Sequence, residues 1–118
     1  MINGIGIDIV ELVRIRGAME RHQSFVTRIL TTKEQTIFHK LTDNRKVEFL
    51  AGRFAAKEAF AKAAGTGIGK QLSWQDVEIT PDINGKPKII SKITLGKIHL
   101  SISHSKEYAV ANVIIEKM

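Results

Sequence analysis

Two carboxylates in this sequence lie where an isolated charge would be costly to bury. Asp8 stands within GIGIDIV, among apolar and small residues, and Glu58 stands in a segment dominated by alanine and phenylalanine. Each needs a partner, either a cation of the protein or a bound metal ion. Gly4 and Gly6 would clear space beside Asp8 for a metal ion or a bulky anion, whereas the simpler alternative for Asp8 is a salt-bridged residue at a strand end.

Cations accompany Glu58 along the same segment, at Arg53, Lys57 and Lys62. Magnesium in proteins takes one or two carboxylates together with waters and the phosphate oxygens of its substrate. Neighbouring cations then neutralise the remaining phosphate charge and the charge that develops on the leaving group. The set fits a magnesium–phosphate site, although Glu58 and Lys62 also have the i,i+4 spacing of an ordinary ion pair on a surface helix.

A histidine near the C-terminus adds a further polar group. His104 ends the alternating stretch IHLSISH, with Ser103 and Ser105 beside it. It is either a turn residue bonded to a backbone carbonyl or a donor to phosphate at the tip of a hairpin.

The spacing of apolar positions indicates the first elements that carry these residues. Residues 2–10 alternate, with the isoleucines at 5, 7 and 9 on one face, which predicts a half-buried strand. Residues 11–22 predict a helix interrupted at Gly17, and residues 32–41 predict a second short helix with Thr32 as its N-cap.

A long helix is predicted for residues 43–64. The segment is rich in alanine, glutamate and lysine, has Asp43 as a possible cap and ends at Gly65. Its apolar and small side chains cover nearly the whole circumference, so we expect it to be largely buried.

The C-terminal half predicts strands. Residues 74–80 and 86–91 read as two strands joined by a turn that contains Asn-Gly, and residues 98–105 and 108–115 read as an antiparallel hairpin. We therefore expect one α+β domain over residues 1–118, with a small antiparallel sheet packed with one long and several short helices.

Composition narrows the class of protein. A chain of 118 residues has the size of one domain and, being short, is a candidate for self-association. It has no cysteine, which excludes disulfides and thiol nucleophiles, and no apolar stretch approaches the roughly 20 residues that span a bilayer. We expect a cytoplasmic protein without a membrane partner, and the net charge of +6 favours a polyanionic partner.

Four segments together resemble the holo-acyl-carrier-protein synthase family of 4′-phosphopantetheinyl transferases. They are GIGIDIVE at 4–11, FLAGRFAAKEAFAKAAGTGIG at 49–69, NGKP at 84–87 and SISHS at 101–105. The resemblance implies that Asp8 and Glu58 bind Mg²⁺ together with pyrophosphate oxygens of coenzyme A. It also implies that the donor site contains Arg53, Lys57, Lys62, Asn84, Gly85, Lys86, Pro87, His104 and Ser105.

The implied reaction is attack of a serine hydroxyl of an acyl carrier protein on the β-phosphate of coenzyme A, which releases adenosine 3′,5′-bisphosphate and supports fatty acid biosynthesis. Magnesium and Lys57 would stabilise the oxyanions. The base is open between a metal-bound water, Glu58 and a neutral Lys57. Water is favoured, because Glu58 is committed to the metal.

Position 10 bears on the metal site and on the assembly. Larger members of the superfamily carry a second acid two residues after the aspartate, whereas this chain has Val10. The resemblance is therefore to the short type, which implies a homotrimer with sites between neighbouring subunits.

The acceptor side also has candidate residues. Arg14, Ala18, Arg21 and Phe25 would project along one stripe if the helix is continuous. Carrier proteins of this family are acidic, so this stripe would steer them electrostatically, and the alternative is a solvated basic face.

Two other classes of function compete with the transferase. A nucleic-acid binding module is disfavoured because the aromatic residues are not interleaved with lysine and arginine as a stacking platform requires. A structural oligomer without an active site would leave Asp8 and its glycines unexplained.

Overall fold

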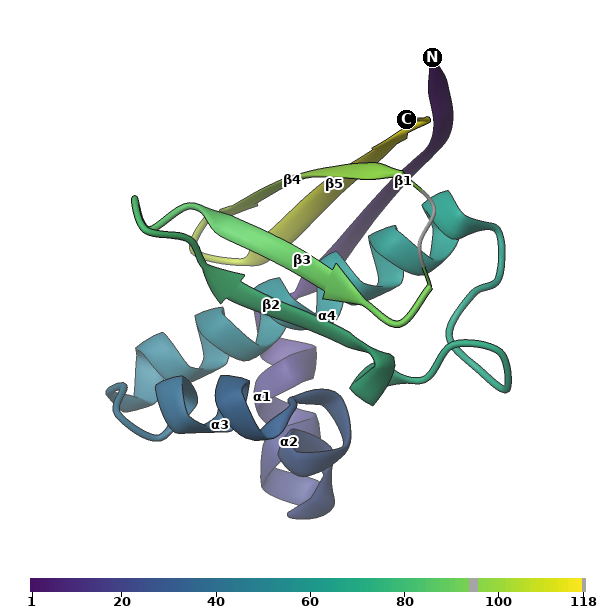
Figure 1. The fold of residues 1–118 in the computed structure, drawn as a ribbon. Helices are drawn as coiled ribbons and strands as arrows, with labels where there is room; N and C mark the ends of the chain where they lie inside the picture. Colours follow the sequence, from purple (N-terminus) through teal and green to yellow (C-terminus); the bar gives the residue numbers. More distant parts are fainter. Residues whose placement is uncertain (94–95, 118) are drawn as a thin grey trace.

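The computed structural model describes residues 1–93 and 96–117, and their fold is of the predicted α+β class (Figure 1). The elements are, in order, β1 (Ile2–Glu11), α1 (Leu12–Arg21), α2 (Ser24–Ile29), α3 (Thr32–Phe38), α4 (Asp43–Ala64), a 3₁₀ helix η1 (Trp74–Asp76), β2 (Val77–Pro81), β3 (Pro87–Ser91), β4 (Lys97–His104) and β5 (Tyr108–Glu116).

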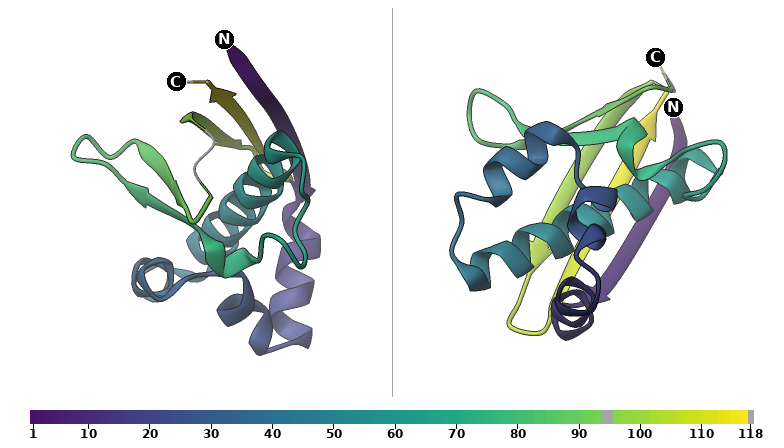
Figure 2. Two further views of the ribbon diagram at one scale, coloured as in Figure 1. Left: turned by 45° about the vertical axis from the view of Figure 1, so that its right-hand side comes forward. Right: turned by 90° about the horizontal axis from the view of Figure 1, so that it is seen from below.

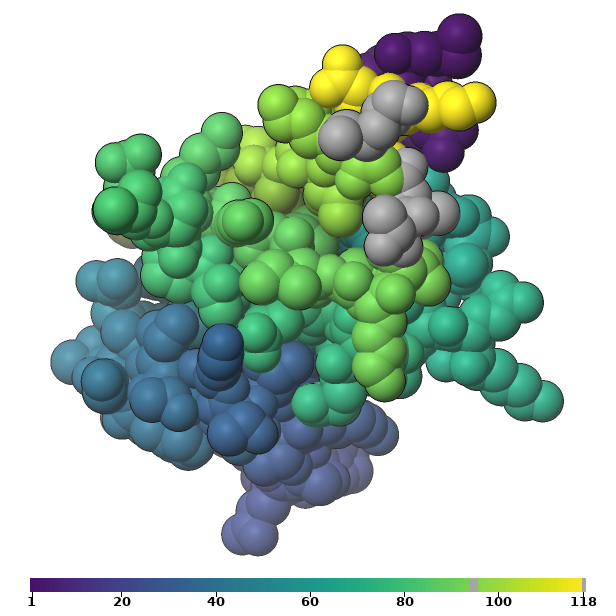
Figure 3. All heavy atoms as spheres, viewed as in Figure 1, coloured from purple at the N-terminus to yellow at the C-terminus, as the bar shows by residue number. Residues whose placement is uncertain are grey.

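The sheet and the long helix form two layers. Strands β1, β5 and β4 make an antiparallel sheet in that order, and α4 packs against it, chiefly on β1 and β5. The short helices α1, α2 and α3 gather around one end of α4, whereas the β2–β3 hairpin reaches β4 (Figure 2). In the space-filling view of Figure 3 the green hairpin lies directly on the blue helices. Among the described residues no helix is both long and apolar enough to cross a membrane.

Strand β1 alternates as predicted, but its buried face is the glycine face. The isoleucines at 5, 7 and 9 are 61–65% exposed. A Cβ atom built on Gly6 would overlap the carbonyl oxygen of Ala59, and one on Gly4 would overlap that of Ala63. The expectation that these glycines leave space for a ligand is therefore wrong, because the backbone of α4 occupies that space.

The long helix is confirmed at both predicted bounds. It is buried along most of its length and ends at Gly65, whose φ of 82° lies in the left-handed region that favours glycine. Its N-cap is Thr42, so Asp43 lies in the first turn, where a carboxylate favours the positive end of the helix dipole.

The short elements differ from the prediction in several places. Helix α2 was not predicted, and α3 ends at Phe38 instead of residue 41. Helix α1 runs through Gly17 without interruption. Helix α3 is capped by Thr31 instead of Thr32, because Thr31 and Glu34 form a reciprocal capping box. Residues 74–76 form a 3₁₀ turn ahead of β2 instead of the start of the strand.

Candidate active site

The fold brings Asp8 and Glu58 to one place. Asp8 lies on the face of β1 that meets α4, and both residues line the same pocket of about 580 Å³. Lys62, one turn beyond Glu58, reaches across to β1, where its Nζ donates to Asp8 Oδ1 at 3.1 Å and to the carbonyl of Ile7 at 3.0 Å. Lys62 thus pairs with the carboxylate on the strand, and the helix-to-strand contact joins the two carboxylates into one site.

The electrostatics of this pair favour a cation. Burial raises the pKa of Glu58, the negative charge of Asp8 raises it further, and Lys62 lowers it. Two neighbouring carboxylates that share one partly exposed ammonium leave a local excess of negative charge at the pair, which a divalent cation would relieve. Within the described residues no group of three or more histidine, aspartate or glutamate side chains could hold a metal, so these two carboxylates would need waters and substrate oxygens to complete a shell.

The basic residues of α1 line the same pocket. Arg14 and Arg21 are exposed at its rim, and Ala18 lies between them. Phe25 also lines the pocket, and it is only 8% exposed. It belongs to α2 instead of the predicted continuous helix, because α1 ends at Arg21. The predicted acceptor stripe is therefore an arginine rim with an aromatic wall, directly beside Asp8 and Glu58.

Arg53 and His104 meet in a second pocket, of about 230 Å³. The guanidinium of Arg53 stacks on Phe49 at 4.1 Å from the ring centroid, and its buried Nε has no hydrogen-bond partner. Burial lowers the pKa of Arg53. Arg45 lines this pocket too and was not predicted, although residues 45, 49 and 53 recur at the i,i+4 spacing that places them along one side of a helix.

The remaining predicted donor residues lie elsewhere in the chain. Asn84 and Gly85 form the β2–β3 turn, and Asp82 Oδ1 accepts the backbone N–H groups of Asn84 and Lys86. Lys86 and Pro87 line a third pocket, of about 350 Å³.

Ser105 has a structural partner. Its hydroxyl oxygen accepts the backbone N–H groups of Glu107 and Tyr108, which closes the β4–β5 turn beside His104. The predicted donor residues are thus distributed over separate pockets of one chain.

Comparisons with known proteins identify the family of the chain. A family model described as the 4′-phosphopantetheinyl transferase superfamily matches residues 4–113. The chain belongs to this superfamily. It is 59% identical over 118 residues to a holo-[acyl-carrier-protein] synthase of Geobacillus sp. (strain WCH70), covering 100% of this chain and 99% of the relative. It is 57% identical over 119 residues to the Bacillus subtilis (strain 168) enzyme of the same name, at 100% and 98% coverage.

Solved structures of superfamily members share the fold. A holo-(acyl-carrier-protein) synthase from Bacillus anthracis str. Ames, in complex with CoA (3′,5′-ADP), superposes with a TM-score of 0.93 at 52% identity, covering 100% of this chain and 99% of that chain. The Helicobacter pylori holo-[acyl-carrier-protein] synthase in complex with coenzyme A gives a TM-score of 0.85 at 34% identity, with 95% and 99% coverage.

Within the superfamily fold, Val10 lines the Asp8–Glu58 pocket with a 9% exposed side chain. An apolar side chain offers no ligand to a metal. The pocket therefore has two carboxylates and no third acid at this position.

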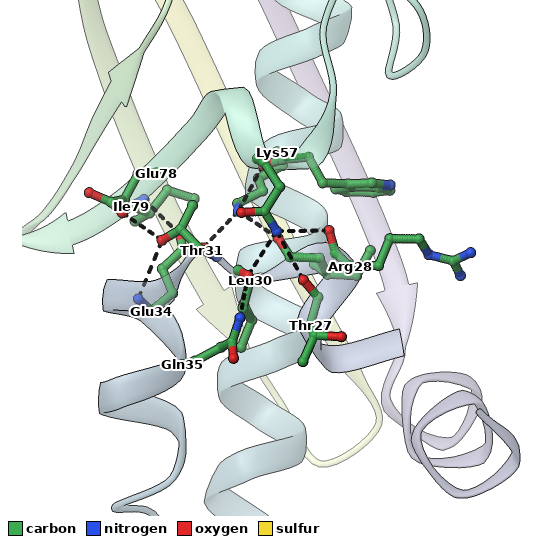
Figure 4. A network of polar contacts seen from close by, with 12 residues as sticks. Thr27, Arg28, Leu30, Thr31, Glu34, Gln35, Lys57, Glu78 and Ile79 are labelled. Atoms are coloured by element: carbon green, nitrogen blue, oxygen red, sulfur yellow. Dashed lines mark hydrogen bonds and ion pairs between the residues drawn. The ribbon is translucent and has the colours of Figure 1, made fainter. Parts of the chain in front are cut away.

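Lys57 departs from the role that the resemblance gave it. Its side chain is 0% exposed, and its Nζ donates to the carbonyl of Ile29 at 2.7 Å, to Glu34 Oε1 at 2.7 Å and to the carbonyl of Trp74 at 3.1 Å (Figure 4). All three N–H donors are used inside the protein. This arrangement does not support the expectation that Lys57 holds donor phosphates or stabilises an oxyanion, because its ammonium donates to three protein oxygens and Lys57 lines none of the pockets described above.

Glu34 is the partner that sequence reasoning missed. Its Oε1 also accepts the N–H of Thr31, and its Oε2 accepts the N–H of Ile79 on β2. A signal was present, because threonine followed three residues later by glutamate is the pattern of a capping box.

Proposed function

We propose that this chain transfers the 4′-phosphopantetheine group of coenzyme A to a serine of an apo acyl carrier protein, giving the holo carrier protein and adenosine 3′,5′-bisphosphate. The observation that carries the proposal is the convergence of Asp8 and Glu58 in a pocket rimmed by Arg14 and Arg21. Relatives that cover the whole chain are named for this reaction, which supports the same conclusion.

The donor set fits Mg²⁺. Asp8 and Glu58 are oxygen ligands, one or two of which magnesium takes alongside water and phosphate oxygens. When bound, the ion would supply positive charge against the donor pyrophosphate. Lys62, half exposed beside Asp8, is placed to neutralise further phosphate charge.

The burial of Lys57 bears on the choice of base. Lys57 Nζ donates to three protein oxygens and has no exposed surface, so it lies out of reach of a bound serine hydroxyl. We therefore favour a metal-bound water or Glu58 over Lys57 as the base.

The test is mass spectrometry of an apo acyl carrier protein incubated with the protein, coenzyme A and Mg²⁺. We expect the carrier to gain the mass of one phosphopantetheine group, and the gain to disappear when the acceptor serine is replaced by alanine. An unmodified carrier after prolonged incubation with excess enzyme would refute the proposal.

The arginine rim predicts a charge-dependent acceptor site. Arg14→Glu is expected to raise the KM for the carrier protein about tenfold at low salt, because it opposes an acidic carrier, and to leave the KM for coenzyme A unchanged. The matched control is Arg16→Glu on the same helix, because Arg16 bonds to Asn44 and does not line this pocket. Equal losses toward both substrates in Arg14→Glu would contradict an acceptor role.

A second copy of the chain would complete the donor site. The donor residues lie in separate pockets, and the outer face of β1 exposes Ile2, Ile5, Ile7 and Ile9 on the edge strand of the sheet. Burying such an apolar stripe against other copies is favourable. We therefore propose self-association through this face, with a homotrimer as the form that the resemblance implies.

The apolar stripe gives a direct prediction. We expect Ile7→Glu to shift the particle to the mass of a single chain in analytical ultracentrifugation and to lower transfer at least about tenfold, because the buried charge opposes association. Ile90→Glu is the control, since Ile90 is a similarly exposed isoleucine on β3. A wild-type protein that sediments as a single chain and is fully active would overturn the assembly.

A further inference from the structure

Helix α2 carries an aromatic wall of the Asp8–Glu58 pocket but has few means of holding itself in place. It has six residues, which is too few for a helix to be stable alone. The residue that α2 adds to the pocket lining is Phe25. The position of that wall must therefore be set by what binds the helix from outside.

Side chains from η1 and α4 hold the C-terminal end of α2 (Figure 4). Gln75 of η1 donates to the carbonyls of Thr27, Arg28 and Leu30 at 2.9–3.2 Å. Lys57 of α4 donates to the carbonyl of Ile29, between them, at 2.7 Å. The last carbonyl groups of a helix have no hydrogen-bond partner within the helix. Gln75 and Lys57 supply these partners and so tie the end of α2 to η1 and α4.

Lys57 also fixes the aromatic stack behind the wall. Its third bond, to the carbonyl of Trp74, holds η1 against α4. The Trp74 ring packs on Phe54 with centroids 4.9 Å apart, and Phe54 packs on Phe25 at 6.3 Å. Phe25 and Phe54 both line the pocket. The ammonium of Lys57 therefore acts on the Phe25 wall in two ways, through its bond to the carbonyl of Ile29 on α2 and through its bond to the carbonyl of Trp74.

We propose that Lys57 is a positioning residue for the acceptor side of the site: together with Glu34 and Gln75 it holds α2 so that Phe25 faces the carboxylate pair. The inference rests on the proposed function. Lys57 has no exposed side-chain surface, whereas its immediate neighbour in sequence, Glu58, lines the pocket from the adjacent position on α4. The same helical turn thus carries the metal ligand on one side and the clamp for the acceptor wall on the other.

The test compares carrier binding with coenzyme A binding, each measured by isothermal titration calorimetry. Lys57→Met alone leaves Glu34 buried without its partner, so the main variant is Lys57→Met/Glu34→Gln, which removes both charges. We expect its carrier Kd to rise about tenfold or more while the coenzyme A Kd stays within about twofold, because Phe25 would no longer be held in place before the carrier binds. Gln75→Ala, in which the altered residue is exposed, should give a smaller loss of the same kind.

Two controls separate positioning from general stability. Lys92→Met removes an exposed lysine that pairs with Asp76 of the same 3₁₀ helix, and it should change neither Kd. Ile115→Ala opens a cavity in the sheet, so it should lower the Tm without changing the carrier Kd. Trp74 is the only tryptophan in the chain, and its emission should shift to longer wavelength in the double variant and not in Lys92→Met.

The outcomes are distinct. A weaker coenzyme A Kd with an unchanged carrier Kd would return Lys57 to the donor site and overturn the proposal. Unchanged values of both constants would show that Lys57 serves stability alone and would overturn it as well. A wild-type protein that binds no carrier would refute the proposed function itself, whereas wild-type binding that the variants retain would refute only the positioning role.

Discussion

Replacing Gly6 with alanine is expected to destabilise the protein by about 3 kcal/mol and to abolish its transfer activity. A Cβ at this position would overlap the carbonyl oxygen of Ala59 and crowd the backbone nitrogen of Ala63, and neither backbone atom can move without displacing α4. The strand must therefore retreat from the helix. Since Asp8 follows on the same face of β1, that retreat also separates Asp8 from Glu58.

Denaturant unfolding and a transfer assay at low temperature would measure the two effects of Gly6→Ala separately. The matched control is Gly69→Ala, because a Cβ at position 69 meets no atom within 4 Å and the residue does not have a positive φ. We expect that variant to be as stable and as active as wild type. Wild-type stability in Gly6→Ala would contradict the close packing of β1 on α4.

Glu58→Gln is expected to lower transfer by a factor of at least about 100, because it removes one of two carboxylates from the metal site and several kcal/mol of charge stabilisation with it. The readout that does not depend on activity is thermal stability. Added Mg²⁺ with coenzyme A should raise the Tm of wild type and leave that of the variant unchanged. A variant that responds to Mg²⁺ like wild type would remove Glu58 from the metal site.

The raised pKa of Glu58 gives this variant a second signature. Burial and Asp8 hold the pKa of Glu58 above its ordinary value in the folded state, so the folded protein binds this proton more tightly than the unfolded chain does. The ionised form therefore costs stability, and that cost grows as the pH rises through the raised pKa. Without metal, Glu58→Gln should melt at a higher temperature than wild type at pH 7, and the difference should vanish near pH 4.

The metal response of wild type should have the opposite pH dependence. Only the ionised carboxylate binds Mg²⁺, so the stabilisation by metal is expected to fall as the pH drops through the raised pKa of Glu58. Thermal melts with and without Mg²⁺ between pH 5 and 8 would measure both trends, and Lys62, which lowers the pKa of Glu58, limits how far the transition moves.

Much of the fold could be predicted because its signals are local. The alternation in residues 2–10, the alanine-rich run ending at Gly65 and the Asn-Gly turn each depend on neighbours in sequence, and each predicted element is present. The errors are the unpredicted helix α2, the predicted interruption at Gly17 and the ends of some elements. Either of two adjacent threonines could cap α3 by sequence. Thr31 is the cap because it forms the reciprocal capping-box bonds with Glu34, three residues later.

The carboxylate pair could be proposed from sequence, but its separation from Lys57 could not. Asp8 and Glu58 both stood out because a charge among apolar residues needs a partner. Lys57 was grouped with Arg53 and Lys62 as a cation near Glu58, and the sequence does not say which partner each charge has. The partner of Lys57 is Glu34, 23 residues away on another helix, and only packing of α3 against α4 brings them together.

The sequence by itself determined that β1 has an apolar face and a glycine face, that residues 43–64 form a buried helix, and that Asp8 and Glu58 are the residues that need explanation. Only the tertiary structure decided that the glycine face is the buried one, since period-2 alternation is the same whichever face meets the core. That choice follows from close contact between two backbones, which the glycines permit, and it turns the isoleucines outward. The same contact places Asp8 beside Glu58 and Lys62, because the next side chain on that face of the strand also points toward α4.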